Sequence, residues 1–85
     1  MNYVYILRSQ KLSEKLYIGL TTNVERRIAE HNRDIRGYTK QYAPWELEVS
    51  IEFRNKKVAE DFERYLKSGS GFAFMKKRFI PALAK

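Results

Sequence analysis

The sequence predicts an α+β fold, a small and mostly antiparallel sheet with helices packed on it. The first observation is the order of patterns along the chain, which runs strand, strand, helix, strand, helix, helix. The second is the segment WELEVSIEF at 45–53, whose alternation of apolar and polar residues is typical of a sheet with one wet side. The third is the length, because 85 residues supply one core and predict a single domain over residues 1–85.

The first two strands are expected at residues 3–8 and 15–21. Both segments alternate and are rich in residues that favour β structure. Since only the polar stretch SQKLSEK joins them, we expect an antiparallel hairpin with Tyr5 and Tyr17 in neighbouring strands. In the third strand, at 45–53, the residues expected to face the core are Leu47, Val49, Ile51 and Phe53.

A first helix is expected after the hairpin. Thr22 and Glu25 have the spacing of a capping box, in which the two side chains bond the free amides of the first turn. The helix then runs to about Arg33. The stretch DIRGYTKQYAP at 34–44 contains Gly, Pro and several polar residues, so it predicts an irregular link.

Two further helices are expected after the third strand. Asn55 begins the first of them, and Gly69 is a natural C-terminal stop. The segment at 70–80 predicts a shorter helix, which Pro81 limits. The SGSG stretch between the two helices is expected to form a turn and a helix cap.

The charge of the chain favours a polyanionic partner. Seventeen Lys and Arg against ten Asp and Glu give a net charge of +7, and nucleic acid is the simplest partner for such an excess. No apolar run is long enough to span a bilayer, so no membrane partner is expected. The absence of Cys fits a reducing, cytoplasmic location.

Polar residues occur on helical faces that should be apolar. Arg27 and His31 share a face of the first helix with Val24, Ile28 and Ile35, whereas Arg26 points nearly the opposite way. On the second helix, Glu63 falls within the stripe formed by Ala59, Phe62 and Leu66. An inward charge is costly unless an opposite charge, a phosphate or a metal meets it. One interpretation is therefore a structural ion pair between Arg27 and Glu63.

The other interpretation is a site that cleaves phosphodiester bonds, formed by Tyr5, Tyr17, Arg27, His31 and Glu63. A carboxylate oxygen suits Mg²⁺, which keeps several waters and binds a phosphate oxygen directly. Arg27 would neutralise charge on the phosphoryl group. A tyrosine would act as general base if nearby cations lowered its pKa, with His31 relaying the proton.

These residues resemble the GIY-YIG nucleases. VYI at 4–6 and YIG at 17–19 look like the paired motifs of the name, and Arg27, ten residues after Tyr17, stands where the family has its catalytic arginine. His31 matches a position that is His or Tyr in many members. In AEDFERYLK the best match to the metal-binding glutamate is Glu63, with Glu60 the second choice.

The resemblance implies a three-stranded antiparallel sheet flanked by helices and an endonuclease that uses one divalent ion, Mg²⁺ or Mn²⁺, held by Glu63. It also implies products with a 3′-hydroxyl and a 5′-phosphate, a tyrosine that helps to deprotonate the water, and a Gly19 that permits close approach. The chain is similar to small stand-alone members related to the N-terminal domain of the excision-repair nuclease subunit. It departs from them at Leu20, where several members carry Lys, and lacks an Asn found beyond the glutamate in many.

Basic residues outside this set are expected to contact DNA. After Glu63 the chain contains Lys and Arg but no acid, which favours a basic surface beside the site. The residues expected there are Arg26, Arg33, Arg36, Lys40, Lys67, Lys76, Lys77 and Arg78. With no element for reading sequence, the protein would recognise a DNA structure or depend on a protein partner. The alternatives are a non-catalytic nucleic-acid-binding module and a subunit that docks an acidic protein.

Overall fold

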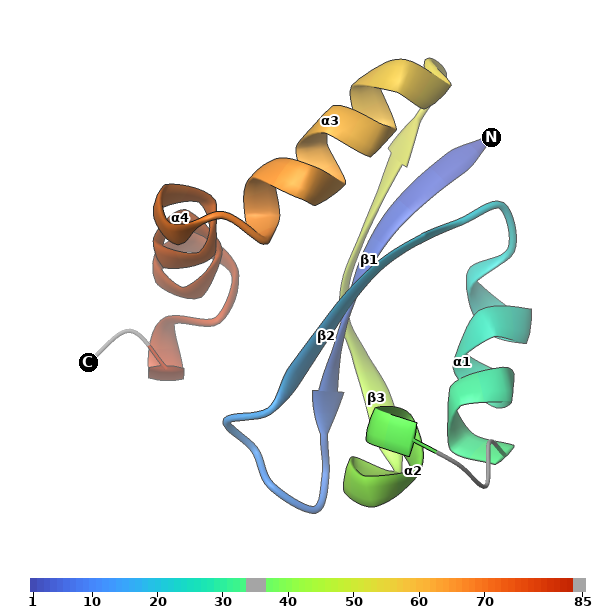
Figure 1. Cartoon of the computed structure of the whole chain (residues 1–85), viewed down its shortest axis with the longest axis vertical. Helices are drawn as coiled ribbons and strands as arrows, with labels where there is room; N and C mark the ends of the chain where they lie inside the picture. Colours follow the sequence, from blue (N-terminus) through green and yellow to red (C-terminus); the bar gives the residue numbers. More distant parts are fainter. Residues whose placement is uncertain (34–36, 84–85) are drawn as a thin grey trace.

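The computed structural model describes residues 1–33 and 37–83 and confirms the α+β class (Figure 1). The elements, in chain order, are β1 (Asn2–Ser9), β2 (Leu16–Thr21), α1 (Val24–Arg33), α2 (Gly37–Tyr42), β3 (Trp45–Phe53), α3 (Lys56–Leu66), α4 (Gly69–Phe79) and a 3₁₀ turn at Pro81–Leu83. Over the described ranges, no helix combines the length and the apolar character that a bilayer span requires.

β1 is the central strand of the sheet, because the strand order is β2-β1-β3. Both neighbours run antiparallel to it, as the predicted hairpin and sheet require. At the middle of β1, Tyr5 lies opposite Gly19 of β2 and Ser50 of β3. Tyr5 therefore sits at the centre of the sheet rather than at its rim.

Helices cover both faces of the sheet (Figure 1). Alternate residues of a strand point to opposite faces, so β1 serves both. Ile6 belongs to a cluster with Met75 of α4. Tyr5 belongs to a second cluster, against which Ile28 of α1 and Tyr42 of α2 pack. The α3 and α4 face is thus the larger apolar core, and the α1 and α2 face carries the tyrosines.

The bounds of β3 are as predicted, but its alternation is interrupted. Ile6 pairs with Val49, whereas the next residue, Leu7, pairs with Leu47, so Glu48 is an extra residue in β3. Such a bulge changes which face the following side chains occupy. The expectation that Leu47 lies in the core with Val49 is therefore wrong, and the Leu47 side chain is 43% exposed.

The first helix and the link after it also differ from expectation. The side chain of Asn23 accepts the N–H of Arg26 at 3.0 Å, so Asn23 caps α1 in place of the predicted Thr22 and Glu25 box. The predicted irregular link contains the helix α2. A helix this short depends on tertiary contacts, and here Tyr42 packs against the cluster that contains Trp45.

The boundary between α3 and α4 lies earlier in the chain than predicted. α3 ends at Leu66, and Gly69 is the first residue of α4 rather than the stop of α3. The reason is Ser68, whose side chain accepts the N–H of Gly71 and caps α4. A Cβ at Gly71 would collide with the carbonyl oxygen of Tyr65. This tight turn fixes the end of α3, which carries Glu63 and Lys67.

Candidate active site

Tyr5 lies flat across the neighbouring strand on the α1 side of the sheet. Its side chain is 1% exposed. A Cβ on the opposite residue, Gly19, would overlap the Tyr5 phenol. The close approach that glycine permits at this position is therefore the approach of the Tyr5 ring to the β2 backbone.

The Tyr5 hydroxyl meets two side chains of α1. It lies 3.0 Å from Nε2 of His31, which is also buried. It accepts the N–H of Arg27 Nε at 3.4 Å. Arg27 and His31 are one turn apart, so both reach the same oxygen. The predicted inward face of this helix is real, although the Arg27 side chain remains 44% exposed.

Electrostatics separates the roles of these groups. Burial raises the pKa of Tyr5 above its usual value, while the hydrogen bond from Arg27 acts in the opposite direction. The pKa of Arg27 is raised in turn, first by its hydrogen bond to Tyr5 and then by Glu30, whose carboxylate lies 3.1 Å from Nη1. The pair is therefore a neutral phenol beside a charged guanidinium.

Tyr17 occupies a more open position than Tyr5. Its ring centroid is 4.4 Å from that of His31 and 6.3 Å from that of Tyr5. Tyr17 is half-buried, and it lines an open depression of about 310 Å³ together with Leu16, Ile18 and Lys67. Of the two tyrosines, Tyr17 is the one that a substrate in this depression would meet.

Glu63 approaches from α3. Its side chain is 20% exposed, and a carboxylate oxygen lies 2.6 Å from Nζ of Lys67. It is near enough to Tyr5 to contribute to the raised pKa of that residue. The ion pair between Arg27 and Glu63, considered from the sequence, is not the pairing found: Arg27 contacts Glu30, and Glu63 contacts Lys67.

The site fits a divalent ion held through one protein carboxylate. Among residues 1–33 and 37–83, no group of three or more His, Cys, Asp or Glu side chains is arranged to hold a metal. Mg²⁺ nevertheless often uses one or two carboxylates together with waters and substrate phosphate. The Glu63 carboxylate already binds a cationic group, the Lys67 ammonium, so its surroundings accept positive charge.

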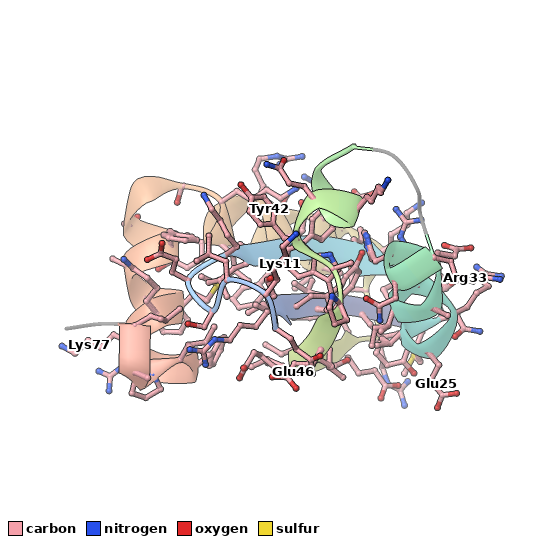
Figure 2. All side chains as sticks on the ribbon, turned by 90° about the horizontal axis from the view of Figure 1, so that it is seen from below. Lys11, Glu25, Arg33, Tyr42, Glu46 and Lys77 are labelled. Carbon is pink, nitrogen blue, oxygen red and sulfur yellow. The ribbon has the colours of Figure 1, made fainter. Side chains whose placement is uncertain are left out.

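The basic residues expected to bind DNA are not gathered in one patch. Arg33 on α1 and Lys77 on α4 lie at opposite ends of the molecule (Figure 2). Arg26 and Lys40 belong to the helices α1 and α2, and both are exposed. Lys76, Lys77 and Arg78 belong to α4, with Lys76 over the ring of Phe72. Lys67 is the member beside the depression, and Arg36 lies outside the described residues.

Two residues of this site were missed from the sequence. Glu30 pairs with Arg27, and its spacing of three residues on a helix is a usable signal. Asn32 accepts the N–H of Trp45 and donates to the Trp45 carbonyl, which joins α1 to the start of β3. Nothing in the local pattern indicates this second contact, because it spans 13 residues.

Comparison with known proteins gives consistent matches. The family model described as the GIY-YIG catalytic domain matches residues 1–78. A UPF0213 protein of Clostridium perfringens (strain 13 / Type A) is 43% identical over 68 residues, which are 79% of this chain and 71% of that protein. The structure-specific endonuclease subunit slx1 of Aspergillus niger is 38% identical over 65 residues, which are 69% of this chain but 15% of that protein.

One solved structure resembles the whole chain. It is the solution NMR structure of the UPF0213 protein BH0048 from Bacillus halodurans, with a TM-score of 0.56 and 29% sequence identity. The match covers 99% of this chain and 93% of that protein. The fold of this chain, with its three-stranded sheet and helices, is therefore shared with that protein.

Proposed function

The chain belongs to the GIY-YIG family, and from this premise we propose that it is a metal-dependent DNA endonuclease that hydrolyses phosphodiester bonds. The observation that carries the proposal is the convergence of Arg27 and His31 on the Tyr5 hydroxyl, beside the more open Tyr17. A packing cluster has no need for a partly exposed guanidinium fixed in this way. The nuclease relatives and the excess of positive charge support the same assignment.

Arg27 is proposed to bind the scissile phosphate. Its Nε is directed by Tyr5 and its Nη1 by Glu30, so the guanidinium is held in place while part of it faces solvent. A fixed positive group aimed at a phosphoryl oxygen stabilises the charge that grows there during attack by water. Because Arg27 stays charged, this role does not depend on pH in the physiological range.

Tyr17 is proposed to take the proton from the attacking water. Tyr5 is unsuited to this step, because burial raises its pKa and its hydroxyl is already used by Arg27 and His31. Tyr17 is half-buried and lines the open depression together with Lys67, so its hydroxyl is the one that a bound water can reach. As the water oxygen bonds to phosphorus, the bond to the 3′ oxygen breaks and that oxygen gains a proton from solvent.

Glu63 is proposed to hold the single divalent ion, Mg²⁺ or Mn²⁺. When bound, such an ion would neutralise phosphate charge and lower the pKa of a coordinated water. Glu63 is half-buried on α3, on the other side of the sheet from α1, and its charge acts on Tyr5. The Asp61 carboxylate of the same helix is exposed and pairs with Lys57 and Arg64 instead.

Target choice is proposed to depend on DNA structure or on a partner protein. The relative from Aspergillus niger is described as a subunit of a structure-specific endonuclease, and the same description applies to the relative from Debaryomyces hansenii. Both are much longer than this chain, which covers 15% and 20% of them. The parts that they have in addition are where such target choice would be supplied.

A non-catalytic nucleic-acid-binding module of the same fold is the second candidate. It is favoured by the ion pair that occupies Glu63 and by the reliance on one carboxylate within the described residues. In that case the basic residues would still bind DNA, and the tyrosine cluster would only stabilise the fold.

Cleavage of labelled single-stranded, duplex and branched DNA with Mg²⁺ or Mn²⁺ separates the two candidates. We expect metal-dependent cleavage that Glu63→Gln abolishes and that the matched control Asp61→Asn, on the exposed side of α3, leaves intact. Loss with Glu60→Gln instead would transfer the metal ligand to Glu60. DNA binding without any metal-dependent product contradicts the enzyme, and cleavage that survives both Glu63→Gln and Arg27→Ala indicates contamination.

A further inference from the structure

The ion pair between Glu63 and Lys67 differs from the other lysine pair on the same helix. Both pairs join residues four apart, with N to O distances of 2.6 Å for Glu63 and Lys67 and 2.8 Å for Lys57 and Asp61. The carboxylate of the first pair is 20% exposed, whereas that of the second is 52% exposed. The Glu63 carboxylate is therefore the more sheltered of the two and has lost much of its water, whereas the Lys67 side chain that pairs with it is 54% exposed.

Lys67 also faces the candidate active site. It lines the depression of about 310 Å³ with Tyr17, Leu16 and Ile18 of β2. The other basic residue at this end of α3, Arg64, is directed to Asp61 on the exposed side. Lys67 thus contacts Glu63 and also lines the depression that a substrate would occupy.

We propose that Lys67 is the resident counter-ion of the metal-binding carboxylate, which competes with the divalent ion for Glu63 and, once displaced, binds the substrate phosphate. This inference rests on the proposed function, because it takes Glu63 as the metal ligand and DNA as the substrate. It adds that metal binding and DNA binding reinforce each other through one side chain.

The chemistry of lysine suits this exchange. A carboxylate that is largely buried is costly without a cation, so an ammonium at Glu63 stabilises the metal-free protein. Lysine is a point charge on a flexible four-carbon stem, and it can change partners without moving the backbone. Its backbone is fixed, because Lys67 caps α3 with an N–H bonded to the carbonyl of Arg64. The ammonium can therefore move from Glu63 to a phosphate in the same depression.

Binding of Mn²⁺ in the absence of DNA tests the competition directly. Electron paramagnetic resonance of free Mn²⁺ gives the affinity of each variant. Because the Lys67 side chain is 54% exposed, solvent weakens the pair, and we expect Lys67→Met to bind Mn²⁺ roughly two- to sixfold more tightly than the unsubstituted protein. Lys67→Arg, which retains the positive charge, should stay closer to the unsubstituted affinity, and Glu63→Gln should lose the site.

Lys57→Met is the matched control, because it removes one positive charge from the same helix on the exposed side. It should leave the Mn²⁺ affinity unchanged. An unchanged or weaker affinity in Lys67→Met overturns the proposal, and so does an equal gain in Lys57→Met, which would mean that net charge alone matters.

The coupling to DNA has its own measurement. A fluorescent branched duplex with phosphorothioate linkages is titrated with and without Mn²⁺. Mn²⁺ should increase the affinity of the unsubstituted protein more than that of Lys67→Met, and an equal increase in both contradicts the release of Lys67 to phosphate. If cleavage depends on Glu63 but Lys67→Met leaves the Mn²⁺ affinity unchanged, the proposed role of Lys67 fails and the proposed function stands. If the Mn²⁺ results hold without any cleavage, the proposed function fails and the competition stands.

Discussion

The two faces of the sheet are built from the same strand but follow different chemistry. On the α3 and α4 face, Val4 and Ile6 meet fully buried apolar residues such as Leu66 and Met75. On the α1 and α2 face, the buried Tyr5 brings a hydroxyl into contact with an imidazole and a guanidinium. The α3 and α4 face is stabilised by apolar packing, whereas the α1 and α2 face also requires a hydrogen-bond partner for each buried polar atom.

This difference indicates how a chain of 85 residues combines a stable core with a polar site. Successive side chains of β1 point to opposite faces of the sheet, so the residues of the core and those of the site can differ independently. Substitutions of the buried apolar residues on the α3 and α4 face should therefore act mainly on stability. Substitutions at the partly exposed groups of the α1 face should act mainly on activity, and those at its buried groups should act on both.

Among the substitutions that compare the two faces, Arg27→Ala is expected to have the largest effect, and this effect should be on activity and not on stability. Loss of one positioned group that stabilises phosphoryl charge lowers kcat by about a hundred- to a thousandfold. The free energy of unfolding should change by about 1 kcal/mol or less, since the side chain is partly exposed. Single-turnover cleavage and urea unfolding measure the two. In the adjacent Arg26→Ala, weaker DNA binding with an unchanged kcat is expected, and an equal loss of kcat would contradict a specific role for Arg27.

Leu66→Ala is the complementary change on the apolar face. The side chain is fully buried in the α3 and α4 cluster, and its truncation leaves a cavity that costs about 2–5 kcal/mol of unfolding free energy. Below the unfolding transition, kcat should remain within about twofold, a change of about 0.4 kcal/mol. A large loss of kcat in a folded Leu66→Ala protein would mean that the two faces are coupled through α3.

Tyr5→Phe tests the buried polar contact on the α1 and α2 face. Without the hydroxyl, Nε2 of the buried His31 loses a partner, and the free energy of unfolding should fall by about 1–3 kcal/mol. Tyr3→Phe, two residues earlier on the same face of β1, is the matched control with an expected change within about 0.5 kcal/mol. Equal effects of the two substitutions in thermal or urea unfolding would remove any special role of the Tyr5 hydroxyl.

The smallest expected effect is a dependence on alkaline pH. Burial raises the pKa of Tyr5, so the unfolded chain, in which tyrosine titrates at about pH 10, loses this proton first. The contribution to stability is complete below that pH and is lost as the pH rises through the higher pKa of the folded state. Between about pH 8 and 11, the free energy of unfolding measured with urea should fall less steeply for Tyr5→Phe than for the unsubstituted protein. Parallel curves would argue against a raised pKa.

Much of this site follows from periodicity. The alternation of residues 3–8 places Tyr5 on one face, and the helical spacing of Arg27 and His31 brings both to the same oxygen. The sheltered position of Glu63 follows in the same way from its neighbours on α3. These are local patterns with a fixed geometry, and a single sequence contains them completely.

The details that the sequence does not provide depend on contacts between elements. Helix ends are one example, because neighbouring residues can serve as the cap equally well. Asn23 rather than Thr22 caps α1, and Ser68 rather than Gly69 marks the boundary between α3 and α4. The helix α2 forms in a polar segment because Tyr42 finds a packing partner. The pairing of Glu63 with Lys67 could not be predicted without knowing that Arg27 pairs with Glu30.

The extra residue Glu48 in β3 has a consequence for the tyrosine site itself. Without it, simple alternation from Val49 would turn Trp45 toward α3, whereas in the structure Trp45 pairs with Ser9 and packs in the cluster of Tyr5 and Leu7. Because of this one inserted residue, β3 contributes Val49 and Phe53 to the apolar core on the α3 face and Trp45 to the tyrosine cluster on the α1 face. The ring centroids of Trp45 and Tyr17 are 6.3 Å apart. A deletion of Glu48 would restore regular pairing between β1 and β3 but would remove the packing of Trp45 against Tyr17.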